Sequence, residues 1–345
     1  MIFNTLPQVP KLTADRYQRR SHISLADVLK AYPDRRYLMF GGKGGLGKTT
    51  FSAAAGYYLA QQGHKVLVFS VDPQASLSDI FQQNIFGKGP VQIMENLWAQ
   101  EIDADQRVKA YQDEIRAKIR DMYGMTELPE EIESYIQAAS AEPAMEESAI
   151  FDAVVDIVVA GDYDYYIYDL VPLGHALYYL SMATVYDAWI DKITGLREQI
   201  REYDQVAAHM GRQDVIDEDA ILNELLYIKE RIQKSSRILT DREKTAFFFV
   251  VVPESMIIKD TLKAADLFAK FKVPISGYVV NRVLPESLKT ESIPDYLKRR
   301  LDMQGKHLAE IQQIFGSQVL AQVPELERDV TGLPMIARVA ELLCG

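Results

Sequence analysis

Short apolar runs alternate with longer amphipathic stretches along most of the chain, which is the pattern of a mostly parallel α/β sheet flanked by helices. The first run covers 37–40, and the run at 246–252 is apolar on both faces, as a central parallel strand is. Helices are expected after the first run, to Gln62, and at the end of the chain, over 335–343. Further buried strands are expected at 65–70, 165–168, 275–280 and 319–323.

Two longer stretches carry a helical period. Apolar residues recur at three- and four-residue steps over about 103–139 and again over about 180–239. These helices either pack on each other and on the sheet, or form a subdomain with a groove for a partner. We expect a helical subdomain at about 100–140 and 180–239, inserted into a domain of residues 37–345. Residues 1–36 are expected to form an N-terminal arm, with Ser24 capping a short helix.

The eight residues between the first strand and its helix, GKGGLGKT, fit the P-loop pattern G-x-x-x-x-G-K-T. Its glycines let backbone N–H groups surround phosphate oxygens, and the helix N-terminus adds a partial positive charge. Lys48 is expected to contact the β- and γ-phosphates, and the Thr49 hydroxyl to hold Mg²⁺. The segment therefore predicts a P-loop NTPase that binds ATP or ADP with Mg²⁺. The nucleotide-binding residues expected here are Gly42, Lys43, Gly44, Gly45, Leu46, Gly47, Lys48, Thr49 and Thr50.

Two aspartates end predicted strands, where ligands bind in parallel sheets. Asp72 follows the second strand and is expected to orient the attacking water near the γ-phosphate, unless it is only a turn residue before Pro73. Asp169 ends the strand at 165–168 in the manner of a Walker-B residue that reaches Mg²⁺. Thr49, Asp72 and Asp169 are thus the expected metal-site residues. Residues 76–79 are expected to belong to the same mobile loop as Asp72.

A second lysine, Lys43, follows the first glycine of the loop, where an ordinary P-loop needs no cation. It is either a solvated surface lysine or a cation directed toward a nucleotide in a facing subunit. The pattern K-G-G-x-G-K-T resembles the deviant Walker-A ATPases, which include the partition ATPases, the nitrogenase iron protein and the arsenite-pump ATPases. That resemblance implies a homodimer that sandwiches nucleotide, with Lys43, Lys48 and Asp72 as catalytic residues.

From about residue 37 onward the motifs resemble more specifically those of the arsenite-pump and tail-anchored-protein-targeting ATPases. Asp72-Pro73 with 76–79 is similar to their first switch, and Asp169 with Pro172, Gly174 and His175 is similar to their second. Residues 143–147 resemble the acidic segment before that second switch. Residues 280–285 resemble the loop whose asparagine reads adenine, and residues 322–326 resemble the loop that flanks the base. The resemblance implies that ATP closes the dimer and that hydrolysis opens it. It also implies that the base is held by Asn281, Arg282, Pro324 and Glu325.

The chain departs from that family at several positions. Gln74-Ala75 replaces the usual Ala-His, and Leu170-Val171 replaces the usual Thr-Ala, so the ATPase rate and its regulation are left open. Cys344 is the single cysteine, so no cysteine cluster for arsenite, no paired C-x-x-C zinc bridge and no [4Fe–4S] cluster is expected. Charged residues over 197–204 argue against a groove for a whole transmembrane helix.

Composition limits the partners. The net charge is −11 and the pI about 5.1, which disfavours sequence-independent nucleic-acid binding. The start lacks a charged-then-apolar signal segment and no apolar run approaches ~20 residues, so we expect a cytoplasmic protein with at most peripheral membrane contact.

We therefore predict a Mg²⁺-dependent ATP hydrolase, a nucleotide-switched homodimer that binds or delivers an unidentified client, protein or hydrophobic ligand, at the helical subdomain. One alternative is a partition- or positioning-type ATPase acting on a membrane or macromolecular surface. A second alternative is a scaffold that binds nucleotide without hydrolysing it, against which the intact Lys48, Asp72 and Asp169 argue.

Overall fold

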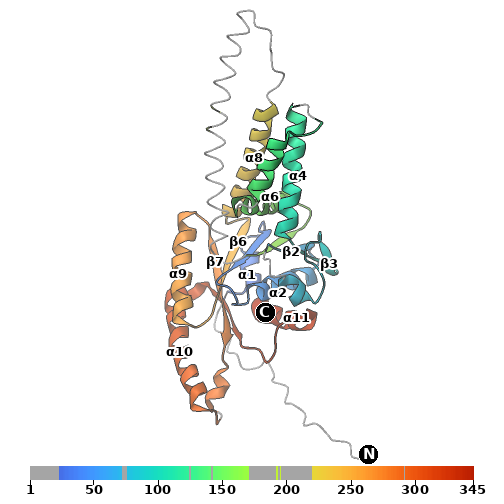
Figure 1. Ribbon diagram of the computed structural model, residues 1–345. Helices are drawn as coiled ribbons and strands as arrows, with labels where there is room; N and C mark the ends of the chain where they lie inside the picture. Colours follow the sequence, from blue (N-terminus) through green and yellow to red (C-terminus); the bar gives the residue numbers. More distant parts are fainter. Residues whose placement is uncertain are drawn as a thin grey trace, which may run out of the picture.

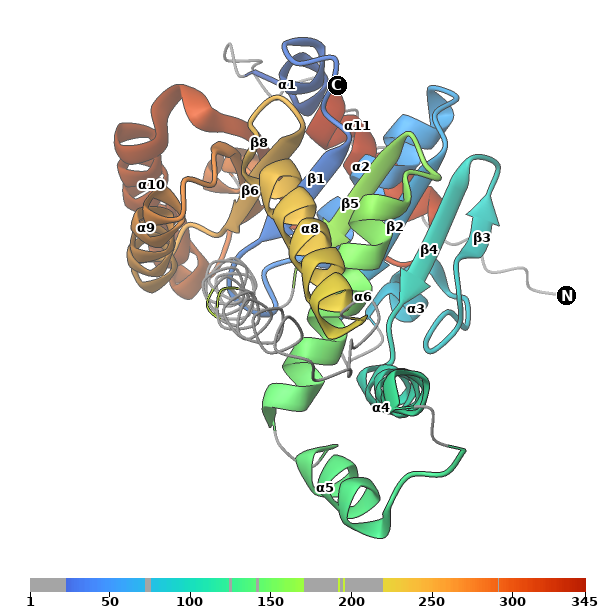
Figure 2. The same ribbon diagram turned by 90° about the horizontal axis from the view of Figure 1, so that it is seen from above.

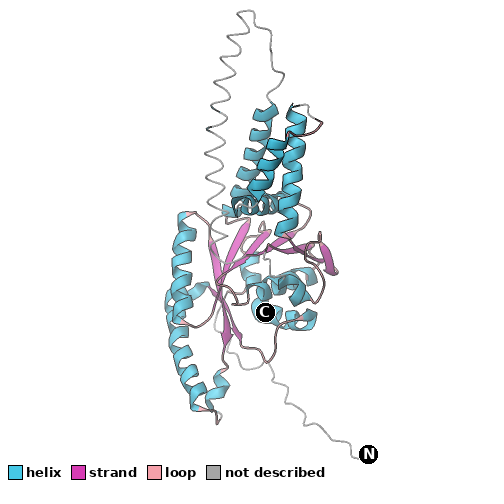
Figure 3. Ribbon diagram, in the orientation of Figure 1, coloured by secondary structure: helices cyan, strands magenta, loops and turns pink. Residues whose placement is uncertain are grey.

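The computed structural model describes residues 23–71, 76–123, 126–140, 143–170, 192, 195, 220–290 and 292–345. Within these residues eight strands form one sheet in the order β3-β4-β2-β5-β1-β6-β7-β8 (Figures 1 and 3). All neighbouring strands are parallel except the β3–β4 edge pair. The strands are β1 (Tyr37–Gly41), β2 (Val66–Ser70), β3 (Val91–Met94), β4 (Leu97–Glu101), β5 (Tyr165–Asp169), β6 (Thr245–Val251), β7 (Ile275–Val283) and β8 (Val319–Pro324).

Helices cover the sheet, and α9 and α10 lie on the opposite side from α2 and α11 (Figure 1). Two short 3₁₀ turns, η1 (Glu286–Thr290) and η2 (Gly316–Gln318), flank α10. The α-helices are α1 (Leu25–Lys30), α2 (Lys48–Gln61), α3 (Ser76–Phe81), α4 (Ala104–Tyr123), α5 (Glu130–Ser140), α6 (Pro143–Ala160), α8 (Ala220–Thr240), α9 (Ser255–Lys270), α10 (Asp295–Phe315) and α11 (Gly332–Cys344).

The predicted fold class, a P-loop α/β sheet with flanking helices, is confirmed. All seven residues of β6 are buried, as its unbroken apolar run requires. Its three phenylalanines, 247–249, are fully buried: Phe247 and Phe249 pack on Phe268 of α9, and Phe248 packs on Phe40 of β1. Aromatic side chains of this size contribute most to the packing of a core. β1 and β6 therefore form the rigid centre from which the loop at 42–47 emerges.

The helices α4, α6 and α8 extend together beyond the sheet, as Figures 1 and 2 show. Arg107 of α4 joins Asp152 of α6 at 2.5 Å, and Arg231 of α8 contacts both Asp152 and Asp156. Burial raises the pKa of Asp156, and the guanidinium of Arg231 offsets part of that rise. Charge pairs of this kind connect the three helices outside the main core.

The expectation of one helical stretch over 103–139 needs correction. The chain forms α4, leaves the helix after Tyr123, and starts α5 at Glu130 after Pro129. A helix is disfavoured at the residue before proline, because the proline ring restricts the preceding backbone. The resemblance-based acidic segment at 143–147 begins α6. Of the second stretch, α8 is described almost in full, and most of 180–219 lies outside the described residues. The bounds of a subdomain stay a prediction.

The described part of the N-terminal arm packs on the core. Ser24 caps α1 as predicted, with Asp27 completing a reciprocal capping box. Leu25, Val28 and Leu29 are buried in the main core cluster. The buried guanidinium of Arg35 donates to the carbonyls of Val28 and Arg242, which fastens the arm to the turn before β6.

Sequence patterns missed the edge hairpin β3–β4, because β4 alternates buried and half-buried positions and β3 is short and partly exposed. The predicted final helix is confirmed and extends over α11. Among the described helices, none is both long enough and apolar enough to cross a bilayer.

Gly56 permits the close approach of α2 to the sheet, and this yields a stability prediction. A Cβ at this position would lie 2.5 Å from Cγ2 of Val68 and 3.2 Å from Cδ1 of Leu97. Overpacking costs about 1–3 kcal/mol, so Gly56→Ala is expected to lower the free energy of unfolding despite its better helix propensity. In the matched control Gly305→Ala, at an exposed position of α10 with nothing within 4 Å, the stability should rise by about 0.5–1 kcal/mol. Urea unfolding followed by circular dichroism measures both, and equal shifts would contradict the packing argument.

Candidate functional site

The carboxyl ends of four adjacent strands are level with one another. Glu101 pairs with Ser70, Ser70 with Asp169, and Asp169 with Phe40, from β4 to β1. β5 and β6 lie on either side of β1. The strands β2 to β5 follow β1 in the chain and lie on one side of it, and β6 to β8 lie on the other side. Ligands bind at such a switch point, beyond the carboxyl ends of the strands. The loop after β1 and the carboxylate of Asp169 therefore meet at this edge.

Two glycines of the loop are required by its close packing. Gly42 has φ +148°, and a Cβ there would lie 2.7 Å from the carbonyl oxygen of Val250. Gly47 caps α2 with φ +100°, and its Cβ would lie 2.6 Å from the side-chain nitrogen of Asn281. Glycine has no Cβ and adopts positive φ readily. These residues let the backbone turn directly from β1 into the N-terminus of α2, which is the geometry of a phosphate-binding loop.

Thr49 and Asp169 are brought together as the sequence predicts. The hydroxyl of Thr49, in the first turn of α2, donates to Oδ2 of Asp169 at 2.6 Å. The buried Ser52, one turn later, donates to Oδ1 of the same carboxylate at 3.2 Å. A hydroxyl and a carboxylate are hard oxygen donors of the kind Mg²⁺ prefers. The residues present therefore fit a divalent cation held between α2 and β5.

The two lysines of the loop differ in environment. Lys48 is buried, and its Nζ donates to the carbonyl oxygen of Lys43 at 3.4 Å, across the loop. Lys43 instead extends to α9, where its Nζ lies 3.4 Å from Oδ2 of Asp260 and 3.6 Å from Sδ of Met256. The side chains of Lys43 and Asp260 are 49% and 42% exposed, so solvent screens this pair. The ammonium group of Lys43 thus lies on α9, and its action toward a facing subunit stays a prediction.

The predicted base-binding residues lie beside the loop. Asn281 donates its side-chain amide to the carbonyl of Leu46 at 2.8 Å, and Arg282 donates to the carbonyl of Gly45 at 2.8 Å. Pro324 ends β8 next to Val283, and the N–H of Glu325 donates to the carbonyl of Val283 at 3.0 Å. The asparagine is therefore fixed against the P-loop itself, a contact the sequence did not predict.

The switch residues are described only in part. Asp72, Gln74 and Ala75 of the first switch lie outside the described residues, as do Val171, Pro172, Gly174 and His175 of the second. Leu170 is buried at the end of β5, and its N–H donates to the carbonyl of Phe40. The expectation that 76–79 belong to a mobile loop is wrong, because Ser76–Phe81 form α3 and bury Leu77. The hydroxyls of Ser76 and Thr49 lie 3.4 Å apart.

Sequence reasoning missed Ser52, Asp260 and Glu101. Ser52 lies three residues after Thr49, on the same face of α2, and this spacing could have been noticed. Asp260 is distant in sequence from the loop that it contacts and has no local signal. Glu101 ends a strand that the apolar pattern did not reveal.

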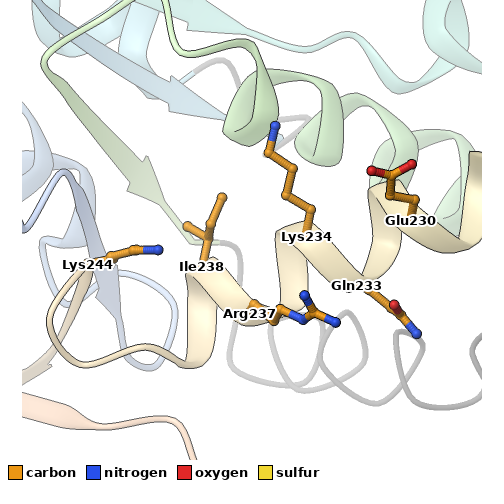
Figure 4. Close-up of a pocket in the computed structure, with 6 residues that line it drawn as sticks. All are labelled: Glu230, Gln233, Lys234, Arg237, Ile238 and Lys244. Atoms are coloured by element: carbon orange, nitrogen blue, oxygen red, sulfur yellow. The ribbon is translucent and has the colours of Figure 1, made fainter.

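Two other features lie apart from this edge. A pocket of about 330 Å³ follows the inner end of α8 and the turn after it (Figure 4). Its described lining includes the cations Lys234, Arg237 and Lys244, and no residue of the P-loop.

Cys344 is buried in α11, and burial raises its pKa to about 12, so the thiol stays protonated at neutral pH.

The parallel sheet, the loop after β1 and the Thr49–Asp169 contact define a P-loop ATPase with the deviant Walker-A lysine. The family model for the anion-transporting ATPase matches residues 35–345. The chain belongs to this family of ATPases.

Curated relatives agree. The chain is 32% identical over 315 residues to arsenical pump-driving ATPase 1 of Aquifex aeolicus, covering 90% of this chain and 79% of the relative. It is 30% identical to ATPase GET3A of Arabidopsis thaliana, covering 86% and 80%. It is 28% identical to ATPase ASNA1 homolog 1 of Paramecium tetraurelia, covering 89% and 92%. The predicted family and the ATPase class are thereby confirmed.

The Ser52 contact with Asp169 yields a test of the cation site. Ser52→Ala removes the hydrogen bond that orients Asp169, and loss of such a partner typically costs about 10–100-fold in metal affinity or activity. We expect the Mg²⁺ concentration for half-maximal ATPase activity to rise by roughly 10-fold. Ser276→Ala is the control, because that buried hydroxyl has no hydrogen-bond partner among the described residues. An unchanged Mg²⁺ dependence in Ser52→Ala would contradict the assigned role.

Proposed function

We propose that the chain is a Mg²⁺-dependent ATPase that works as a nucleotide-switched homodimer and binds or delivers a client at its helical subdomain. The observation that carries the proposal is the joint placement of Thr49 and Asp169 beside the P-loop, with Lys43 directed away from it. The family supports ATP as the nucleotide.

The residues have distinct proposed roles in hydrolysis. Backbone N–H groups of the loop and Lys48 would hold the phosphates, and Thr49 and Asp169 would hold Mg²⁺, which when bound would supply positive charge against the phosphoryl oxygens. Asp72 follows the end of β2 by two residues and orients the attacking water. Phosphoryl transfer requires mainly positioning and charge stabilisation, so this set is sufficient for slow hydrolysis.

The role of Asp72 predicts a separation of binding from turnover. Asp72→Asn should retain ATP affinity, because the phosphate cradle is intact, and should lose most hydrolysis, by roughly 100-fold or more. Asp302→Asn, at an exposed position of α10, is the matched control and should hydrolyse ATP at close to the parent rate. The measurements are nucleotide affinity by fluorescence titration and phosphate release. Parent-like turnover in Asp72→Asn would refute the assignment of Asp72.

Asn281, Arg282, Pro324 and Glu325 are proposed to surround the base. The asparagine amide uses one N–H on Leu46, and it retains a second N–H and its carbonyl oxygen for adenine. An amide donates and accepts at once, which complements the exocyclic amine and ring nitrogen of adenine. This geometry favours ATP over GTP.

A homodimer is proposed because Lys43 has no task toward its own phosphates. In the single chain Lys43 rests on Asp260, through an exposed pair of the kind worth about 0–1 kcal/mol. A γ-phosphate held by a second copy is a stronger partner for the ammonium group, since it carries more charge and is enclosed at the interface. Nucleotide binding is then expected to move Lys43 from Asp260 to the partner site.

Mixing variants tests whether Lys43 acts across the dimer. Lys43→Ala should reduce turnover by roughly 10-fold or more, below the ~10³–10⁵ of the strongest trans-acting cations, with ATP affinity nearly intact. Lys48→Ala should be inactive as well. In a mixed dimer one site keeps Lys48 and receives Lys43 from its partner, so activity should partly return. If heterodimers form and no activity returns, Lys43 does not act in trans.

The client is proposed to bind the helices beyond the sheet. Leu226 and Tyr227 of α8 are 44% and 54% exposed, which provides some apolar surface for a protein or hydrophobic ligand. The names of the relatives refer to an arsenical pump in one case and to GET3 in another. With one cysteine, whose thiol is protonated, capture of arsenite or zinc through thiolates is not part of the proposed function.

A further inference from the structure

Glu101, the last residue of β4, is a fully buried carboxylate, and within the described part of the chain its side-chain hydrogen bonds come from one short segment. Its Oε1 accepts from the N–H of Leu77 at 2.5 Å, and its Oε2 accepts from the N–H of Ser78 at 3.1 Å. The hydroxyl of Ser78 donates to the same Oε2 at 2.5 Å. Burying a carboxylate is costly unless it is well bonded. The bonds therefore fasten the start of α3 to the end of β4.

Ser78 extends this cluster to the next turn of the chain. Its hydroxyl oxygen accepts from the N–H groups of Ile85 and Phe86 at 3.1 and 3.2 Å. The N–H of Gly87 donates to the backbone carbonyl of Glu101 at 3.1 Å. The strand end, α3 and the segment 85–87 are thus held by one hydrogen-bonded network, with the Glu101 carboxylate at its centre.

The hydrogen-bonded network around Glu101 lies next to the proposed ATPase site. Glu101 is level with Ser70 and, through it, with Asp169. The first residue of α3, Ser76, has its hydroxyl 3.4 Å from that of Thr49. Glu101 therefore fixes the helix whose first residue lies beside Thr49, an expected Mg²⁺ ligand.

We propose that Glu101 is a positioning residue of the ATPase site: its carboxylate sets where α3 begins, and so how Ser76, the first residue of α3, lies beside Thr49. It acts through α3 and contacts no reacting group. This inference rests on the proposed ATPase site and deepens it. A displacement of catalytic groups by about 1 Å can cost ~10²-fold in rate, so an anchor of this kind has a measurable effect on turnover.

Glu101→Gln is the principal test, made in the full chain. The substitution keeps the size of the side chain, but one acceptor oxygen becomes an NH₂ group that faces N–H and O–H donors. We expect kcat to fall roughly 10–100-fold, while affinity for a non-hydrolysable ATP analogue changes by less than about 3-fold. Glu95→Gln is the matched control, because Glu95 is an exposed glutamate in the neighbouring β3–β4 turn. It should behave as the parent.

Local hydrogen exchange distinguishes positioning from general stability. In the parent, Mg²⁺ with the ATP analogue should slow amide exchange across 77–81. In Glu101→Gln this protection should be lost, although the melting temperature stays near that of the parent. Ser78→Ala keeps the two backbone bonds to Glu101 and removes the hydroxyl, so a smaller fall in kcat, about 3–10-fold, is expected.

The outcomes separate the two proposals. Parent-like kcat in Glu101→Gln, or kcat and affinity falling together with the melting temperature, overturns the positioning role. If Glu101→Gln does not fold, parent-like turnover in Ser78→Ala overturns it instead. Full turnover in Asp72→Asn with slow Glu101→Gln refutes the role of Asp72 alone. A parent chain that binds ATP without hydrolysing it refutes the proposed hydrolysis, and the exchange measurement then decides on Glu101.

Discussion

The level alignment of parallel strand ends is the constraint on which the site depends. Because β4, β2, β5 and β1 are paired in one register, Glu101, Ser70, Asp169 and Phe40 lie in a row across the carboxyl edge. Parallel strands bury both faces and leave few polar positions inside the sheet. The polar residues at their ends are therefore brought close together by backbone pairing alone, although they are far apart in sequence. A shift of one residue in any of these pairs would turn the side chains to the other face.

The last residues of β7 support the P-loop from the other side of β1. Asn281 and Arg282 bond two successive carbonyls of the loop, and Arg282 does so with φ +56°, which is uncommon for a residue other than glycine. Gln304 of α10 holds the following backbone, because its side-chain amide accepts from the N–H of Leu284 and donates to the carbonyl of Leu284. Strain at such a residue persists where its surroundings fix it on both sides. The phosphate loop is thus fixed by packing between two strands and by side chains from a third.

Local signals in the sequence were sufficient for the motifs and for the strands that are apolar throughout. β1, β2, β5 and β6 and the P-loop followed from runs of buried residues and from glycine spacing. The β3–β4 hairpin and α3 did not follow, because their stability comes from tertiary partners. The hydrogen bonds from α3 to Glu101 reach from 77–78 to the end of a strand that the sequence pattern did not show. The contact between Lys43 and Asp260 could not be predicted for the same reason, since 217 positions separate the two residues.

The Lys43–Asp260 pair has properties that suit a switch. A buried ion pair would be costly to break, because each charge would be left in a low-dielectric interior without a partner. Both side chains here are about half exposed, so water solvates each of them when they separate. The pair therefore orders the lysine on α9 at little cost to its release. Met256, which lies beside the ammonium and is 65% exposed, gives α9 an uncovered apolar surface at the same place. A second copy docked over this surface would exclude water from Lys43, and exclusion of water strengthens the attraction between an ammonium and a phosphate. Closure of the dimer and movement of Lys43 to the partner's phosphate would then reinforce each other. Loss of the γ-phosphate would return the lysine to Asp260.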